Sequence, residues 1–122
     1  MKIRSITVFC QPGFPPNRLL LQQLGIFAGH ARKLYEQAGY EVESLRLATP
    51  PFVSFLSPEN LVEAALTLAI ETQAEGFEYI SLGPVPADRP DLLQPIPQVL
   101  TQTQSVFFSA QLTTPNHEVN LP

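Results

Sequence analysis

Residues 3–48 read IRSITVFCQPGFPPNRLLLQQLGIFAGHARKLYEQAGYEVESLRLA, a strand pattern, a long helix pattern and a second strand pattern in succession. Ile3 to Phe9 are rich in β-branched and aromatic residues and stop at a Gln-Pro-Gly turn. Asn17 to Ala38 carry apolar residues three or four positions apart, and Gly39 suits the left-handed position after a helix. Glu41 to Ala48 alternate apolar and polar side chains. This succession predicts a parallel β-α-β unit.

The pattern also predicts which surfaces of this unit are buried. Residues 6–10 are apolar on both faces, which predicts an inner strand, and residues 41–48 look half-exposed, which predicts an edge strand. Gly25 and Gly29 share a helix face and predict close packing there, with a ligand approaching the backbone as the alternative. The apolar stripe expected along the helix is Leu20, Leu24, Phe27, Ala31, Leu34 and Ala38.

The alternation of strands and helices continues along the chain. Ser57 is a good N-cap for a second helix that runs to about Glu75. The stripe that this helix should bury is Leu61, Val62, Ala65, Leu66, Ala69 and Ile70. The remaining elements are expected as a strand over 77–82, a turn near 91–93, a short helix over 98–103 and a strand over 105–112. Residues 1–122 therefore predict a single α/β unit with parallel strands in the order β-α-β-α-β-α-β.

Composition narrows the classes of function. The net charge is −4 and the seven Lys and Arg residues are scattered, whereas nucleic-acid-binding proteins usually carry a basic stripe, so no nucleic-acid partner is predicted. Only 15% of the residues are charged, which suggests that a partner covers some of the surface. The single cysteine, Cys10, excludes an intramolecular disulfide and suits a reducing compartment. With no apolar run long enough for a signal peptide or a spanning helix, we expect a cytoplasmic chain and no membrane partner.

The chain contains none of the strong catalytic or cofactor motifs. No G-x-G-x-x-G turn follows the first strand, and no P-loop, nucleophile elbow or zinc spacing occurs. His30 has no ligand-spaced partner, and residues 116–118 are adjacent, so their side chains would rarely converge on one ion. We therefore expect no cofactor and no metal.

In parallel α/β sheets, ligands bind beyond the carboxyl ends of the strands. The loops expected there, residues 10–14, 49–52, 83–89 and 113–118, hold six of the thirteen prolines, which either frame a stiff pocket or simply end the strands. Cys10 could act as a nucleophile with His117 as its base, or it could be a small buried apolar residue. Asp88 and Arg89 could equally belong to a solvated loop. The candidate ligand-binding residues are Cys10, Gln11, Gly13, Thr49, Gly83, Asp88, Arg89, Asn116 and His117.

Several short segments together resemble the start of a known protein family. They are Met1 to Thr7, the turn at 11–13, residues 38–42 leading to 46–52, residues 79–84 and residues 117–121. The chain resembles the amino-terminal part of an uncharacterised bacterial and archaeal family, similar in fold to the ten-stranded α/β barrel of pyruvate formate-lyase and anaerobic ribonucleotide reductase. The resemblance implies a part of a larger barrel and no particular activity. Radical chemistry does not follow, because the chain has one cysteine and no radical-bearing glycine loop.

Two functions stay open at this stage. The first is a small-molecule-binding or enzymatic domain with its site at the carboxyl ends of the strands. The second is a non-catalytic structural module that forms a homo-oligomer or pairs with a carboxyl-terminal region beyond residue 122, because a half-barrel would leave apolar surfaces uncovered. The reactivity of Cys10 would discriminate between them, since a catalytic thiol alkylates quickly at neutral pH and a structural thiol does not.

Overall fold

The computed structural model describes residues 1–113, in which strands and helices alternate as expected. The strands are β1 (Lys2–Phe9), β2 (Glu41–Thr49), β3 (Tyr79–Leu82) and β4 (Val106–Phe107), and the helices are α1 (Arg18–Gln37), α2 (Leu61–Ala74) and α3 (Ile96–Gln102). Three short 3-10 turns, η1 (Phe52–Ser54), η2 (Pro58–Asn60) and η3 (Pro90–Leu93), lie in the connections. Val85 and Ala110 form an isolated parallel bridge beyond β4, so the last strand is shorter than the sequence predicts.

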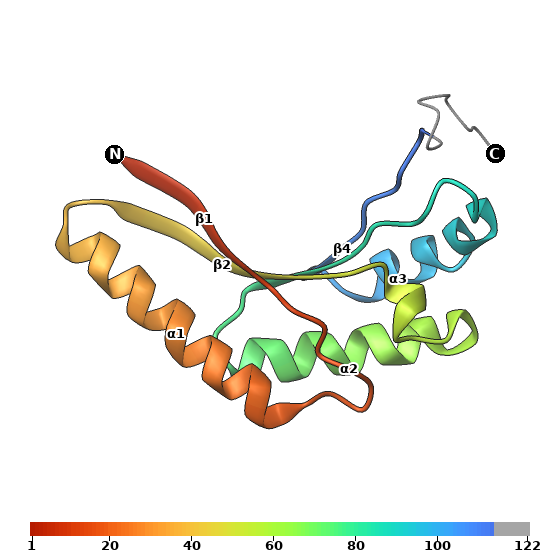
Figure 1. Cartoon of the computed structure of the whole chain (residues 1–122), viewed down its shortest axis with the longest axis horizontal. Coiled ribbons are helices and arrows are strands. Elements are labelled where there is room, and N and C mark those ends of the chain that lie inside the picture. The colour runs from red at the N-terminus through yellow and green to blue at the C-terminus, as the bar shows by residue number, and fades with distance from the viewer. Residues whose placement is uncertain (114–122) are drawn as a thin grey trace.

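All four strands are parallel and lie in the sheet in chain order, β1-β2-β3-β4. This confirms the predicted α/β class. Because parallel crossovers are right-handed, strands added in one direction place their connecting helices on the same side. Figure 1 shows α1, α2 and α3 on one side of the sheet, and no helix of residues 1–113 covers the other side, which we call the open face. Sequential order also suits a barrel segment, but closure into a barrel stays a prediction.

The predicted strand positions are wrong, because the alternation in β2 has another cause. β2 lies inside the sheet between β1 and β3, and β1 is an edge strand. Leu45 and Leu47 are buried on the helix side, while Arg46 projects from the open face. A one-sided helix layer therefore gives a central strand the pattern of an edge strand. In β1 the apolar Phe9, on the open face, is 80% exposed.

The hydrophobic core lies between the sheet and the helices. A lateral row of Val8, Leu47, Ile80 and Val106 follows from the strand register and faces the helix layer. The core is completed from α1, α2, α3 and the loops by residues that include Leu21, Ala28, Phe52, Leu61, Ala64, Ala65, Leu68, Leu92 and Val99.

The predicted stripe of α2 is partly wrong. Leu61, Ala65 and Ala69 are buried as expected, but Ile70 is 68% exposed and Leu68, outside the predicted stripe, is fully buried. Successive residues of an α-helix are 100° apart around its axis, so a core that reaches both sides of Ala65 selects Leu68 rather than Ile70. The 3-10 turn η2 precedes α2, and the side chain of Ser57 makes no capping hydrogen bond.

The predicted apolar stripe of α1 is partly wrong, because Leu24 packs half-buried against the core while other members of the stripe are exposed. Leu21 and Ala28 are buried, whereas Phe27 is 65% and Leu34 is 55% exposed. α1 packs on β1 and β2 at the edge of the sheet and contacts α2 on one flank only, so its other flank has no neighbour within residues 1–113. The predicted close packing is confirmed at Gly25, where an added Cβ would meet the backbone of Glu75, but Gly29 has open space.

Candidate ligand site on the open face

Two adjoining hollows lie near the carboxyl ends of β1 and β2, the first on the open face and the second at the ends of the two strands. The first, of about 250 Å³, is lined by Thr7, Arg46, Leu47, Ala48, Tyr79, Ser81 and Phe107. The second, of about 330 Å³, is lined by Phe9, Cys10, Gln11, Ala48, Thr49 and Pro50. Ala48 belongs to both, and its small side chain leaves the space between them.

Strand register sets the arrangement of the first hollow. Thr7, Arg46 and Tyr79 are neighbours in one lateral row across β1, β2 and β3. Two residues further along each strand, Ala48 pairs with Ser81, which pairs with Phe107. Side chains two residues apart on a strand share a face, so these two rows form one surface. The surface combines hydroxyls, aromatic rings and one cation.

Arg46 lies at the centre of this surface and is half-buried. Its Nε donates a hydrogen bond to Ser44 Oγ at 3.2 Å, and its guanidinium carbon lies 5.3 Å from the centre of the Tyr79 ring. The Tyr79 ring in turn packs on Phe107 with centroids 5.3 Å apart. The cation–π contact and the Nε hydrogen bond hold the guanidinium in place.

The remaining donors of Arg46 are not used by the described part of the chain. Four ion pairs occur among residues 1–113: Lys2 with Glu43, Arg18 with Glu71, Arg32 with Glu78, and Arg89 with Asp91. Arg46 takes part in none of them, and within residues 1–113 its Nη1 and Nη2 make no hydrogen bond to protein. The Glu43 and Glu78 carboxylates are held by Lys2 and Arg32, so neither forms an ion pair with Arg46.

Cys10 lies in the second hollow, at the carboxyl end of β1. Its backbone N–H donates to the Ala48 carbonyl at 3.0 Å, which extends the β1–β2 ladder by one residue. Partial burial raises the pKa of its thiol above the ordinary value of 9.0. A nucleophilic cysteine needs the opposite shift, from a cation or a helix N-terminus. The thiol is therefore protonated and weakly nucleophilic at neutral pH.

The structure brings only some of the predicted site residues together. Cys10, Gln11 and Thr49 line one hollow. The Thr49 hydroxyl donates a hydrogen bond to the Pro50 carbonyl at 2.8 Å, at the carboxyl end of β2. Gly83 follows β3, where an added Cβ would meet Ser109, so its role there is close packing.

The other predicted residues lie elsewhere or outside the described part. Gly13 adopts a positive φ of 74° in the loop before α1. Asp88 and Arg89 are exposed at the start of η3, where Arg89 donates to both carboxylate oxygens of Asp91 at 3.0 and 2.9 Å. Asn116 and His117 lie outside the described residues, and so does the proposed pairing of His117 with Cys10.

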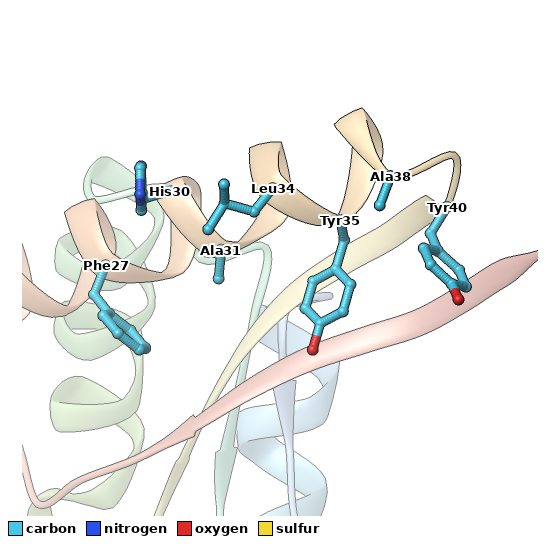
Figure 2. A pocket seen from close by; sticks show the side chains of 7 residues that line it. All are labelled: Phe27, His30, Ala31, Leu34, Tyr35, Ala38 and Tyr40. Atoms are coloured by element: carbon cyan, nitrogen blue, oxygen red, sulfur yellow. The ribbon is translucent and has the colours of Figure 1, made fainter.

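A separate apolar groove of about 440 Å³ runs along the exposed flank of α1. It is lined by Phe27, His30, Ala31, Leu34, Tyr35, Ala38 and Tyr40. Figure 2 shows Phe27, Tyr35 and Tyr40 pointing to the same side of α1, and the Tyr35 and Tyr40 rings meet edge to face with centroids 6.1 Å apart. This α1 groove lies on the far side of the sheet from Arg46.

Within residues 1–113, no three His, Cys, Asp or Glu residues are grouped closely enough to hold a metal ion. The helices of this part of the chain are also too short or too polar to cross a bilayer.

Sequence reasoning missed Arg46, Tyr79, Ser81 and Phe107 as site residues. Ser44 and Arg46 alternate with Leu45 and Leu47, which places them on one face, but pattern alone does not show that β2 and β3 are neighbours. Knowledge that β2 and β3 are neighbours would have shown that their polar faces form one surface, and this surface contains the hollow.

The sequence matches no family model, no curated protein and no solved structure. The family resemblance drawn from the sequence therefore stays a prediction.

Proposed function

We propose that this chain is a small-molecule-binding α/β unit whose ligand occupies the open-face hollow around Arg46 and the adjoining hollow at the ends of β1 and β2. The carrying observation is that the hollows adjoin at Ala48 and combine a half-buried cation, hydroxyl groups and aromatic walls. Ligand pockets have this composition, with mostly apolar walls and a few placed polar groups. Their position near the carboxyl ends of parallel strands supports the same conclusion.

Binding is favoured over catalysis at this site. Cys10 is the strongest nucleophile near the hollows, and burial raises its pKa, so it stays protonated at neutral pH. A catalytic thiol or hydroxyl also needs a hydrogen-bonded base, and none of the described residues supplies one to Cys10. A thiol that needs to stay reduced suits the cytoplasm as the compartment of this function.

A fragment screen followed by ¹H–¹⁵N NMR tests the proposal. Fragments should shift amide signals of β1, β2 and β3, and Ala48→Phe, which fills the junction of the hollows, should abolish these shifts. Ser5→Phe is the matched control, because Ser5 lies on the same face of β1 but outside both hollows. Fragments that bind equally well to the Ala48→Phe variant, or a library without a single binder there, would refute the site.

Self-association is the second candidate function, and the α1 groove favours it. The outer edge of β1 makes no strand pairing within residues 1–113, and the apolar flank of α1 lies beside it. A two-fold axis perpendicular to the sheet would pair β1 with β1 of a second copy and bring both α1 flanks together. A two-fold interface must be self-complementary. The groove suits this because it holds no carboxylate, lysine or arginine that would repel its copy.

Sedimentation velocity over a concentration series tests self-association. Phe27→Glu should shift the distribution toward the monomer, because it places a charge in the groove. Ile26→Glu is the matched control, since Ile26 is adjacent and equally exposed, at 67% against 65%, but lies outside the groove. A wild-type chain that stays monomeric at high concentration, or equal effects of the two variants, would exclude this second function.

A further inference from the structure

We propose that the ligand of the open-face hollow is a small organic anion, a carboxylate or a phosphate monoester, that Arg46 binds through Nη1 and Nη2. This inference rests on the proposed small-molecule function and names the chemical class of its ligand. It follows from the hydroxyl groups and aromatic rings around Arg46 and from the lack of a carboxylate partner for Arg46 within residues 1–113.

The geometry of the Arg46 guanidinium supports an anionic ligand. Nε is committed to Ser44 Oγ, and the Ser44 hydroxyl donates in turn to the Arg4 carbonyl at 3.2 Å. The end of the fork, Nη1 and Nη2, remains available to a ligand, and two parallel N–H donors match the two oxygens of a carboxylate or phosphate. Lysine would supply a charge but no such fork.

The electrostatic environment of Arg46 also favours an anionic ligand. Removing the charge of an arginine from water without an anionic partner is costly. Arg32, which is comparably buried, has one in Glu78 at 3.0 Å. Arg46 makes no ion pair within residues 1–113, and its charge is met there by the neutral π face of the Tyr79 ring. An anionic ligand would complete the pairing that the protein itself does not provide.

The wall of the hollow suits the organic part of such a ligand. Thr7, whose hydroxyl lies 3.4 Å from Ser5 Oγ, is in the row of Arg46, and Ser81 is in the next row on the same face. Both hydroxyls line the hollow and can donate to additional ligand oxygens. Tyr79 and Phe107 supply adjacent aromatic surface, which suits an apolar or aromatic portion of the ligand. The combined chemistry fits an organic anion better than a bare inorganic ion.

Titration with three probes of similar size tests the inference: phenyl phosphate, benzoate and the neutral benzyl alcohol. Dissociation constants come from ¹H–¹⁵N NMR shifts of the hollow, including the Nε–H signal of Arg46. The anions should bind at least about tenfold more tightly than benzyl alcohol, a difference of about 1.4 kcal/mol. Arg46→Gln should remove this preference, and Arg46→Lys should retain only part of it, because the charge stays and the fork is lost.

Arg4→Gln is the matched control, because it removes the same charge from the opposite face of β1. It should leave every dissociation constant within about twofold of the wild-type value. Equal losses in Arg4→Gln and Arg46→Gln would show nonspecific charge attraction and overturn the inference. If Arg46→Gln loses the dispersed native spectrum, Arg46→Lys carries the test, and unchanged phenyl phosphate binding by that variant overturns it.

The outcomes also separate this inference from the function on which it rests. If benzyl alcohol shifts the hollow signals and Arg46→Gln changes no dissociation constant, the anion is refuted while the binding site stands. If no probe shifts these signals and the fragment screen finds no binder there, both proposals fail.

Discussion

Gly25 and Gly29 lie one turn apart on α1, yet the same substitution should change the stability of the protein in opposite directions at the two positions. A Cβ at Gly25 would lie 3.1 Å from Glu75 Cβ and 3.2 Å from its carbonyl carbon, with the carbonyl oxygen closer still. Glu75 is the C-cap residue of α2, so the obstacle is backbone that no side-chain rotation removes. A Cβ at Gly29 meets no atom within 4 Å.

The magnitude follows from two opposing effects. Replacing glycine by alanine inside a helix stabilises it by about 1 kcal/mol, because less conformational entropy is lost on folding. Gly29→Ala should therefore raise the free energy of unfolding by about 0.5–1 kcal/mol. At Gly25, overpacking of the α1–α2 contact costs about 1–3 kcal/mol, which leaves a net loss of up to about 2 kcal/mol. The two variants should differ by about 2 kcal/mol.

Urea unfolding followed by circular dichroism measures both changes on the full chain. Thermal unfolding gives a second readout of the same difference. With an unfolding entropy of about 2.1 cal/mol/K per residue over 122 residues, a difference of about 2 kcal/mol separates the two Tm values by about 8 °C. A Gly25→Ala variant as stable as Gly29→Ala would refute the close approach of α1 to the end of α2.

Two further outcomes test the environment of individual side chains. Iodoacetamide should alkylate Cys10 several-fold more slowly in the native chain than in the urea-unfolded chain at pH 8, and equal rates would contradict its burial. Because burial raises the pKa of Cys10 above 9.0, the stabilisation from its neutral thiol is complete below pH 9 and is lost as the pH rises through the folded-state value. Leu68→Ala should cost about 2–5 kcal/mol in the free energy of unfolding and Ile70→Ala less than about 0.5 kcal/mol, and similar losses would contradict the orientation of α2.

Local sequence chemistry predicted the order and type of the elements. Asn17 caps α1 through its side chain, which accepts a hydrogen bond from the Leu20 N–H at 3.1 Å. Gly39 and Gly76 follow α1 and α2 with φ values of 94° and 96°, a conformation that favours glycine. These signals depend on neighbouring residues along the chain, so they are visible without knowledge of the tertiary structure.

Burial was harder to predict because it depends on partners distant in sequence. The apolar stripe of Phe27 and Leu34 is real, but α1 lies at the edge of the sheet and turns that stripe outward. The alternation of β2 is also real, yet it arises from a one-sided helix layer in a central strand. In both cases the pattern revealed amphipathicity and did not reveal which neighbour lies on each side.

The same limit explains the candidate site. The rule that ligands bind at the carboxyl ends of strands selected loops, and three of the residues selected, Cys10, Gln11 and Thr49, line one hollow. The residue with the strongest binding chemistry, Arg46, lies within a strand, three positions before the end of β2. Its role depends on Tyr79 and Ser81 of the adjacent strand, and strand adjacency is not encoded in a single stretch of sequence.

Strand order also makes the two candidate functions independent. Because the strands follow chain order, the helices of residues 1–113 lie on one side, so the open face and the α1 groove are on opposite sides of the same sheet. Arg46 faces the first, and Phe27 lies on the second. Loss of the Arg46 guanidinium should therefore leave self-association unchanged. A charge introduced at Phe27 should likewise leave anion binding unchanged. A single variant that abolished both would show instead that the ligand site is completed across the interface between two copies.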